Sequence, residues 1–313
     1  MTFPPDQWAL ILGGSSGFGL ATARKLARHG MNLCLVHRDR RGAMARIEPA
    51  FADLRRLGPA VVTINADALD AEARSAIVDR LATAMGTAGR VRVLLHSIAF
   101  GNLKLLVPER AAPRSALPAL AAALGIAAER LTATVDTLLA EGCDELGALA
   151  SPPAYPSGTF LDDEDFARTI YSMGTSALTW TQAILARGLF ADDARVVGLT
   201  SEGNQVAWKG YAAVAAAKVA LESVSRAMAV ELAPYGIRSN VVQAGVTDTP
   251  ALRAIPGGEH LKAQARARNP FRRLTTPEDV ADVIYLLSTD EAAWINGALI
   301  RVDGGEHVSG AIA

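Results

Sequence analysis

The sequence predicts a doubly wound α/β fold, with a parallel sheet of seven strands in a single domain of residues 1–313. Short apolar runs alternate with longer segments of helical periodicity, as in β-α-β units. The first apolar run also leads into a glycine-rich turn that opens a helix. The expected strands span residues 8–12, 32–37, 60–64, 91–96, 195–200, 237–243 and 298–302. The expected helices span residues 18–29, 41–57, 71–85, 165–189, 211–233 and 277–288, the last beginning after a capping Thr276 with Pro277.

Composition and charge narrow the class of protein. Half of the residues are hydrophobic and the formal net charge is −1, which argues against a disordered chain and against a nucleic-acid binder. The two cysteines, Cys34 and Cys143, lack metal-ligand spacing and indicate a reduced cytoplasmic setting. No apolar run is long enough to span a bilayer, and the early strand leaves no room for a signal sequence. We therefore expect a cytoplasmic protein that binds a small molecule.

The first strand runs into the turn Leu12-Gly-Gly-Ser-Ser-Gly-Phe-Gly19. This spacing, G-x-x-x-G-x-G, lets backbone N–H groups and the helix N-terminus approach a pyrophosphate. A glycine cluster alone could be a structural turn, but its place between a strand and an amphipathic helix favours a dinucleotide site. The candidate binding residues are Gly13, Ser15, Ser16, Gly17, Phe18 and Gly19.

The ends of the second and third strands bear on which dinucleotide binds. Arg38 follows the second strand, where a guanidinium can hold a 2′-phosphate with two hydrogen bonds. NADPH is therefore favoured over NADH, and the alternative is a solvated turn in which Asp39 meets the ribose. Asp67, after the third strand, can meet the adenine amine or be a plain loop residue.

Tyr211 and Lys218 are candidates for catalysis. A step of seven residues on a helix returns to nearly the same azimuth about 10 Å further on, so both side chains leave one stripe of an apolar helix. A phenol beside an ammonium group can donate a proton or stabilise an oxyanion. The alternative is a surface tyrosine with a snorkelling lysine.

The segment of residues 103–160 interrupts the alternation of strands and helices. It is long for a connection, rich in Ala and Pro, and has helical periodicity at residues 128–140. It follows the fourth strand, so it leaves the sheet at the carboxyl edge, where such folds bind ligands. We expect a lid that sets substrate choice, or an oligomer contact.

The segment of residues 246–270 is expected to cover the substrate. Its apolar candidates for contact with the substrate are Leu252, Ala254, Ile255 and Leu261. Basic residues surround them: Arg253, Lys262, Arg266, Arg268, Arg272 and Arg273. A basic surface there can steer an anionic substrate or partner electrostatically, and the alternative is a solvated helix face.

The glycine turn, the Tyr/Lys pair and the ending Asn296-Gly-Ala-Leu-Ile-Arg-Val-Asp-Gly-Gly305 resemble the short-chain dehydrogenase/reductase superfamily, which has a Rossmann fold, over all but the insert. Most members space the pair Y-x-x-x-K, and no tyrosine here has a lysine four residues later. The Y-x6-K spacing is similar to that of the bacterial enoyl-acyl-carrier-protein reductases. The stretches His96-Ser-Ile-Ala-Phe100 and Gln243-Ala-Gly-Val-Thr-Asp-Thr249 resemble the same branch.

The resemblance implies an NADPH-dependent enoyl-thioester reductase, acting on acyl carrier protein or coenzyme A esters in fatty-acid biosynthesis or another lipid pathway, and forming a homotetramer. Tyr211 would donate a hydrogen bond to the enolate oxygen, while Lys218 would hold the nicotinamide ribose and bias the phenol electrostatically. The residues implied to border the cofactor are Ser97, Ile98, Gly245, Thr247 and Thr249.

Two other functions stay open. Many enoyl reductases carry an aromatic residue ten positions before the active tyrosine, and Ser201 stands there. A serine near the tyrosine resembles the carbonyl-reducing branch, in which a hydroxyl orients the carbonyl, so a ketone or 3-oxoacyl reductase is the first alternative. A non-catalytic dinucleotide-binding protein is the second.

Overall fold

The computed structural model describes residues 2–110, 116–155 and 158–310. Within them lies one parallel sheet of seven strands in the order β3-β2-β1-β4-β5-β6-β7, and the predicted fold class is confirmed. The strands are β1 Gln7–Leu12, β2 Asn32–His37, β3 Val61–Asn65, β4 Arg90–His96, β5 Phe190–Ser201, β6 Ile237–Ala244 and β7 Leu299–Val302. Only β5 departs clearly from its predicted range, because it begins at Phe190 and pairs there with Val91 before a register shift.

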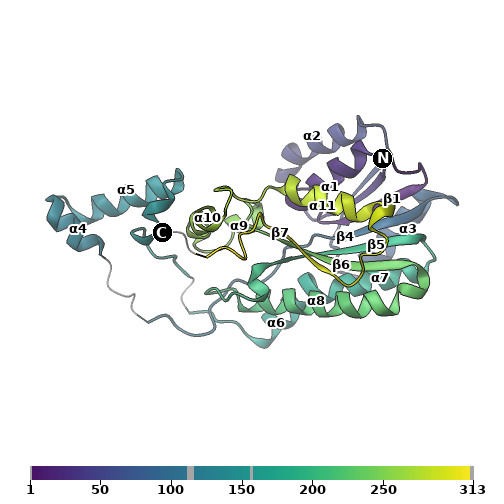
Figure 1. Ribbon diagram of the computed structural model, residues 1–313. Helices are drawn as coiled ribbons and strands as arrows, with labels where there is room; N and C mark the ends of the chain where they lie inside the picture. The colour runs from purple at the N-terminus through teal and green to yellow at the C-terminus, as the bar shows by residue number, and fades with distance from the viewer. Residues whose placement is uncertain (1, 111–115, 156–157, 311–313) are drawn as a thin grey trace.

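Helices cover both faces of the sheet (Figure 1). On one face lie α1 Gly17–Arg28, α2 Met44–Arg55 and α11 Pro277–Ser288, which share a buried core with the strands. On the other lie α3 Ala71–Met85, α7 Ser176–Ala186 and α8 Ala212–Glu231. The predicted start of α11 is confirmed, because Thr276 and Asp279 form a reciprocal capping box. The region expected as helix 41–57 begins instead with a 3-10 turn, Arg41–Ala43, before α2.

The expectation of one continuous helix over 165–189 is wrong. The structure has α6 Asp163–Ile170, then a π-helical turn at Tyr171–Thr175, then α7. At this turn the chain packs against α8 so closely that a Cβ on Gly174 would lie 2.8 Å from the carbonyl oxygen of Ala217. The extra residue of a π turn shifts the helix register there, and such turns are frequent beside functional sites.

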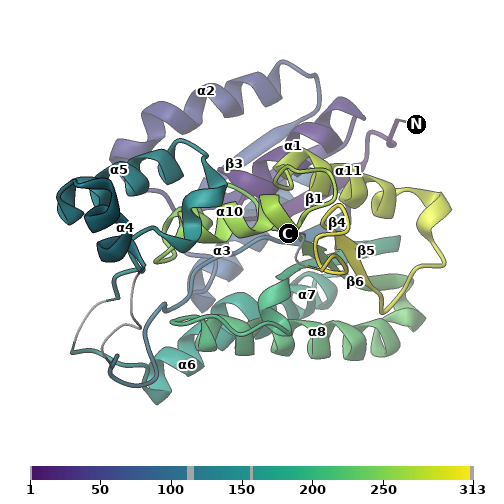
Figure 2. The same cartoon turned by 60° about the vertical axis from the view of Figure 1, so that its left-hand side comes forward.

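The insert between β4 and α6 forms a helical layer away from the sheet. It contains α4 Leu117–Leu124, α5 Ala128–Ala140 and a 3-10 turn at Asp144–Ala148. The helix predicted at 128–140 is confirmed, whereas α4 was not predicted. Figures 1 and 2 show α5 next to α10 Gly258–Arg268, which follows the short helix α9 Pro250–Arg253 in the expected substrate loop. The insert therefore packs on the expected substrate loop, which follows the carboxyl end of β6.

Among the helices in the described part of the chain, none combines the length and apolar character needed to cross a lipid bilayer.

Candidate active site

Two adjoining cavities open at the carboxyl ends of the central strands. The outer one is bordered by the glycine turn and the ends of β2, β3 and β4: its lining includes Gly13, Ser15, Ser16, Gly17, Phe18, Arg38, Asp39, Asp67, Ser97, Ile98 and Phe100. The inner one shares Phe18, Ser97, Ile98 and Thr249 with it and reaches Ser201, Tyr211, Lys218, Gly245 and Thr247. The sequence-predicted candidates thus lie along one continuous cleft, apart from Gly19.

The glycine turn fits the pyrophosphate of a dinucleotide. Gly13 has φ +87°, and a Cβ there would lie 2.3 Å from the Ser97 carbonyl oxygen. Gly19 does not face the cleft, because a Cβ there would lie 2.1 Å from the carbonyl oxygen of Gly13, so its role is close packing of α1 on the turn. The side chain of Ser16 makes no capping hydrogen bond at the start of α1, and the first turn of α1 carries no acidic residue. The N–H groups and the positive end of the helix dipole are therefore available to an anion.

At the adenosine end, Arg38 is held by an exposed contact. Its Nη1 donates to Asp67 Oδ2 at 2.7 Å, and its guanidinium lies 4.5 Å from the centre of the Phe100 ring. Burial raises the pKa of Asp67, but hydrogen bonds from the Leu69 N–H and Arg38 outweigh it and leave this pKa below its usual value. About half of the Arg38 side chain is exposed. Asp39, the alternative ribose contact, accepts a hydrogen bond from His37 Nδ1 at 2.9 Å.

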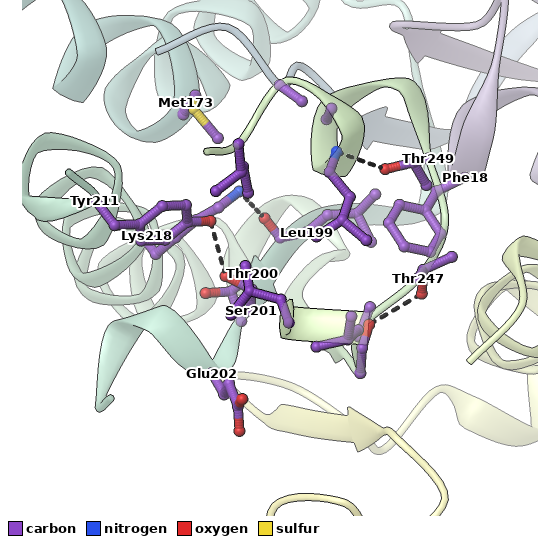
Figure 3. Close-up of a pocket in the computed structure, with 18 of the residues that line it drawn as sticks. Phe18, Met173, Leu199, Thr200, Ser201, Glu202, Tyr211, Lys218, Thr247 and Thr249 are labelled. Atoms are coloured by element: carbon purple, nitrogen blue, oxygen red, sulfur yellow. Dashed lines mark hydrogen bonds between the residues drawn. The ribbon is translucent and has the colours of Figure 1, made fainter. Parts of the chain in front are cut away.

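Tyr211 and Lys218 point into the inner cavity (Figure 3). Lys218 lies in α8, and its Nζ donates to the Leu199 carbonyl oxygen at 2.8 Å. The seven-residue spacing predicts that Tyr211 lies on this helix. Instead, Tyr211 is the residue that precedes the helix, with φ −112° and ψ 3°. Both side chains are almost completely buried. The position of Tyr211 is therefore set by the turn before α8 as well as by the helix.

Ser201, at the end of β5, joins this pair. Its Oγ lies 3.5 Å from the Tyr211 hydroxyl oxygen. The Tyr211 ring is enclosed by Trp208, edge-on at 5.4 Å between ring centres, and by Gly203, where a Cβ would lie 2.5 Å from the ring. The structure thus brings the three predicted catalytic residues together in a closed setting.

Burial governs the ionisation of these groups. It raises the pKa of the Tyr211 phenol, and the hydrogen bond with Ser201 offsets only part of the rise. The expected easing of phenol ionisation by Lys218 is not observed, so Tyr211 is a neutral hydrogen-bond donor at neutral pH. Burial lowers the pKa of Lys218 to about 8. The lysine is therefore mostly charged at pH 7 but loses its charge in mild alkali.

His96 is a further buried polar group at the end of β4. Its Nε2 is 2.8 Å from Ser176 Oγ, beside the π turn. Burial, and then the charge of Lys218, lower the pKa of His96 to about 3. It is therefore a neutral structural group beneath Ser97, which lines the cleft.

Apolar side chains form most of the wall of the inner cavity. From the expected substrate loop, Leu252, Ile255 and Leu261 line it, whereas Ala254 lines the outer, cofactor cavity. Met173 and Trp208 also line it and were not singled out from the sequence. Trp208 stands three residues before Tyr211, and this closeness in sequence could have identified it as a residue beside the site.

The expected basic surface is largely neutralised within the chain. Five of the six residues form ion pairs: Arg253 with Asp248, Lys262 with Glu259, Arg266 with Asp144, Arg268 with Glu202 and Glu306, and Arg273 with Asp279. The sixth, Arg272, donates to the Ala267 carbonyl oxygen. Asp144 belongs to the insert, so one of these pairs fastens the insert to α10. These basic residues therefore have partners within the chain, and the docking of a carrier stays a prediction.

Family models match two parts of the chain. Residues 148–307, more than half of the chain, match a model described as enoyl-(acyl carrier protein) reductase, and residues 7–106 match one described as short chain dehydrogenase. The chain belongs to the short-chain dehydrogenase/reductase superfamily. It is an NAD(P)H-dependent oxidoreductase of this superfamily.

Individual relatives are distant. The chain is 27% identical to a cis-4-hydroxycyclohexanecarboxylate dehydrogenase of Sinomonas cyclohexanicum, over 96% of both chains. It is 39% identical to a 1-cyclohexenylcarbonyl-CoA reductase of Streptomyces collinus, over 37% of this chain and 42% of that one. A short chain dehydrogenase from Burkholderia cenocepacia in complex with NADP is 25% identical, with a TM-score of 0.67 over 96% of this chain and 97% of that one. An enoyl-acyl-carrier-protein reductase from Anaplasma phagocytophilum shares the fold at 19% identity, with a TM-score of 0.68 over 97% and 93% of the two chains.

Proposed function

We propose that the protein is an NADPH-dependent enoyl-thioester reductase. The observation that supports this most is a neutral, buried Tyr211 in a mainly apolar cavity that it shares with Lys218, seven positions further along the chain. A neutral phenol donates a hydrogen bond where negative charge develops, and that is what reduction of a conjugated thioester needs.

The chemistry divides between cofactor and protein. When bound, the reduced nicotinamide supplies a hydride to the β-carbon of the substrate. The π electrons of the double bond then move toward the thioester carbonyl oxygen, to which Tyr211 donates its hydrogen bond. A proton from water at the α-carbon would complete the saturated thioester. Lys218, which is mostly charged at pH 7, would hold the ribose of the cofactor.

For the substrate, we propose a thioester with a short acyl chain or a ring. The walls made by Met173, Leu252, Ile255 and Leu261 favour an apolar acyl group. Because the basic residues around the loop are paired with carboxylates, they give no preference between a coenzyme A ester and an acidic carrier protein. The partial similarity to a 1-cyclohexenylcarbonyl-CoA reductase accords with this substrate class.

A carbonyl reductase is the second candidate. The Ser201 hydroxyl beside that of Tyr211 favours it, because two hydroxyls can hold one ketone oxygen. Crotonyl-CoA, cyclohexenylcarbonyl-CoA and acetoacetyl-CoA, each offered with NADPH, separate the two. Oxidation of NADPH by the first two alone supports the enoyl reductase, and oxidation by acetoacetyl-CoA alone supports the ketone reductase. No oxidation with any substrate, despite tight NADPH binding, would indicate a non-catalytic dinucleotide-binding protein.

We also propose a cytoplasmic homotetramer working in fatty-acid or related acyl metabolism. Exposed apolar residues support self-association: Val230 on α8 is 75% exposed and Trp294 is 96% exposed. Light scattering coupled to size-exclusion chromatography tests the assembly, and a monomer at micromolar concentration would contradict it.

A further inference from the structure

Both ends of the insert meet the turn that carries Tyr211. Glu109, near the beginning of the insert, forms an ion pair with Lys209, with 2.9 Å between Glu109 Oε1 and Lys209 Nζ. Tyr155, near its end, donates its hydroxyl to the Lys209 carbonyl oxygen at 3.2 Å. The insert therefore holds Lys209, two positions before Tyr211, by its side chain and by its backbone.

The Tyr155 ring also covers the next residue, Gly210. Gly210 has φ +70°, and a Cβ there would lie 2.7 Å from Tyr155 Cε1. The contact is thus direct packing of an aromatic ring on backbone, one position before Tyr211. Partial burial of Tyr155 in this contact raises the pKa of its phenol.

The same short segment touches the substrate loop. Gly257, which precedes α10, has φ +80°, and a Cβ there would lie 2.5 Å from Cγ of Pro153. Earlier in the insert, Asp144 accepts two hydrogen bonds of 2.5 Å from Arg266 of α10. Residues 153–155 therefore bridge the turn with Tyr211 and the loop whose Leu261 lines the cavity.

Tyr211 needs such support because it lies outside the regular helix. Its N–H reaches the Trp208 carbonyl oxygen at 3.3 Å, a long hydrogen bond, while its carbonyl oxygen accepts from the Ala215 N–H at 2.8 Å and its ring packs on Trp208. The start of α8 therefore fixes one end of the turn, and the insert contacts the turn just before Tyr211. A displacement of about 1 Å at a reacting group can cost about 100-fold in rate.

We propose that Tyr155 is a positioning residue: by its hydrogen bond to Lys209 and its ring on Gly210, it fixes the turn that presents the Tyr211 hydroxyl to the substrate. The inference rests on the proposed function of Tyr211 as hydrogen-bond donor. It gives the insert a task in catalysis, separate from covering the acyl group.

The test compares Tyr155→Ala and Tyr155→Phe with Tyr235→Ala as the matched control, because Tyr235 is 58% exposed and lies beyond the far end of α8. The full chain is labelled with 3-fluorotyrosine, which gives signals for five tyrosines, and Tyr211→Phe assigns the signal of Tyr211. In Tyr155→Ala we expect the Tyr211 signal to shift and its pKa to fall toward that of an exposed tyrosine. Tyr155→Phe keeps the ring and is expected to leave the Tyr211 signal near that of the parent, and Tyr235→Ala is expected to leave it unchanged.

Turnover gives the second readout. With the substrate identified above, Tyr155→Ala is expected to lower kcat about 30-fold, within the range for a misplaced reacting group, while NADPH affinity stays within about twofold. Tyr155→Phe is expected to lose about threefold, the value of one neutral hydrogen bond.

The two readouts keep this inference apart from the proposed function. A shifted Tyr211 signal in Tyr155→Ala, with no reduction of any thioester or ketone by the parent, would support the contact and overturn the function. An unchanged Tyr211 signal, or equal changes in Tyr155→Ala and Tyr235→Ala, would overturn the inference. So would a fall in kcat of Tyr155→Ala without any change in its Tyr211 signal, because Tyr155 would then act on the substrate directly.

Discussion

The hydroxyl oxygen of Tyr211 lies 3.5 Å from that of Ser201. The ring of Tyr211 packs between an edge-on Trp208 and Gly203, whose lack of a side chain leaves room for it. Two hydroxyls at this separation serve different reactions. A conjugated thioester receives the hydride at its β-carbon and needs one hydrogen-bond donor at its carbonyl oxygen. A ketone receives the hydride at the carbonyl carbon itself, and two donors can hold its oxygen. The relative loss of activity when each hydroxyl is removed therefore distinguishes an enoyl-thioester reductase from a ketone reductase.

Removing each hydroxyl in turn is the first prediction. Tyr211→Phe should lower kcat/KM for an enoyl thioester by about 100-fold, because one preorganised donor to a developing oxyanion is worth about that much. Ser201→Ala should lower it by less than about threefold, the weight of a peripheral hydrogen bond. Steady-state NADPH oxidation measures both, with NADPH affinity by fluorescence titration as the control. Equal losses in the two variants would favour the ketone reductase.

The buried charge of Lys218 gives a prediction about stability. Burial lowers the pKa of Lys218 from 10.5 to about 8, so between these values the unfolded chain holds more protons and stability rises with pH. Below pH 8 the folded protein carries the full cost, about 3 kcal/mol at 1.36 kcal/mol per pH unit. Lys218→Met removes this cost and loses the hydrogen bond to the Leu199 carbonyl oxygen, which costs about 1 kcal/mol.

We therefore expect Lys218→Met to be more stable than the parent by about 2 kcal/mol at pH 7. Near pH 10.5, the ordinary lysine pKa, the advantage should disappear. Urea unfolding at the two pH values measures the difference. The same variant should bind the cofactor more weakly, and in the parent kcat should fall as pH rises through about 8. A stability difference independent of pH would contradict the buried charge as its cause.

The parts of the fold that depend on local pattern were predictable. The run at β2 and the helices at α3 and α11 were placed at their observed bounds, because alternation, capping residues and glycine turns are written in neighbouring residues. The break at the π turn was not predictable, since its cause is the approach of Gly174 to α8, a contact between distant segments. Arg92 and Arg195 show the same limit: they are buried in strands and donate to the carbonyl oxygens of Leu287, Ser288 and Thr289 at the end of α11.

For the site, spacing identified the residues but not their surroundings. Gly13, Tyr211 and Lys218 were placed in one cleft because the edge of a parallel sheet gathers them. The pairing of Arg266 with Asp144 could not be predicted, because the insert supplies that carboxylate from a distance of many residues along the chain. Charge patterns read along a sequence do not reveal which charges are already neutralised.

Arg38 allows a test of cofactor preference. Its ion pair with Asp67 is about half exposed, and exposed pairs are weak, so it can open to accept a 2′-phosphate. Arg38→Ala should weaken NADPH binding by about 30-fold, the value of a charge-assisted hydrogen bond to phosphate. NADH binding should change less than about twofold, since it lacks the phosphate. Isothermal titration measures both, with Arg41→Ala as the control for net charge. Equal weakening of NADH and NADPH would contradict a phosphate contact.

Arg268, one of the basic residues near the substrate loop, joins two buried carboxylates: its Nη2 donates to Glu202 at 2.6 Å and to Glu306 at 2.9 Å. Arg268→Met leaves both without their cation. Removing one partner of a buried ion pair costs about 3 kcal/mol or more, so the free energy of unfolding should fall by about that amount at pH 8.

The loss from Arg268→Met should shrink toward pH 5, because burial already raises the pKa of Glu306 and protonation relieves the unpaired charge. Activity should fall alike for long and short thioesters, since Glu202 lines the inner cavity and would move in both cases. Denaturant unfolding at the two pH values, with exposed Arg272→Met as the control, tests this. A raised KM for a carrier-bound substrate alone, at unchanged stability, would restore the docking role.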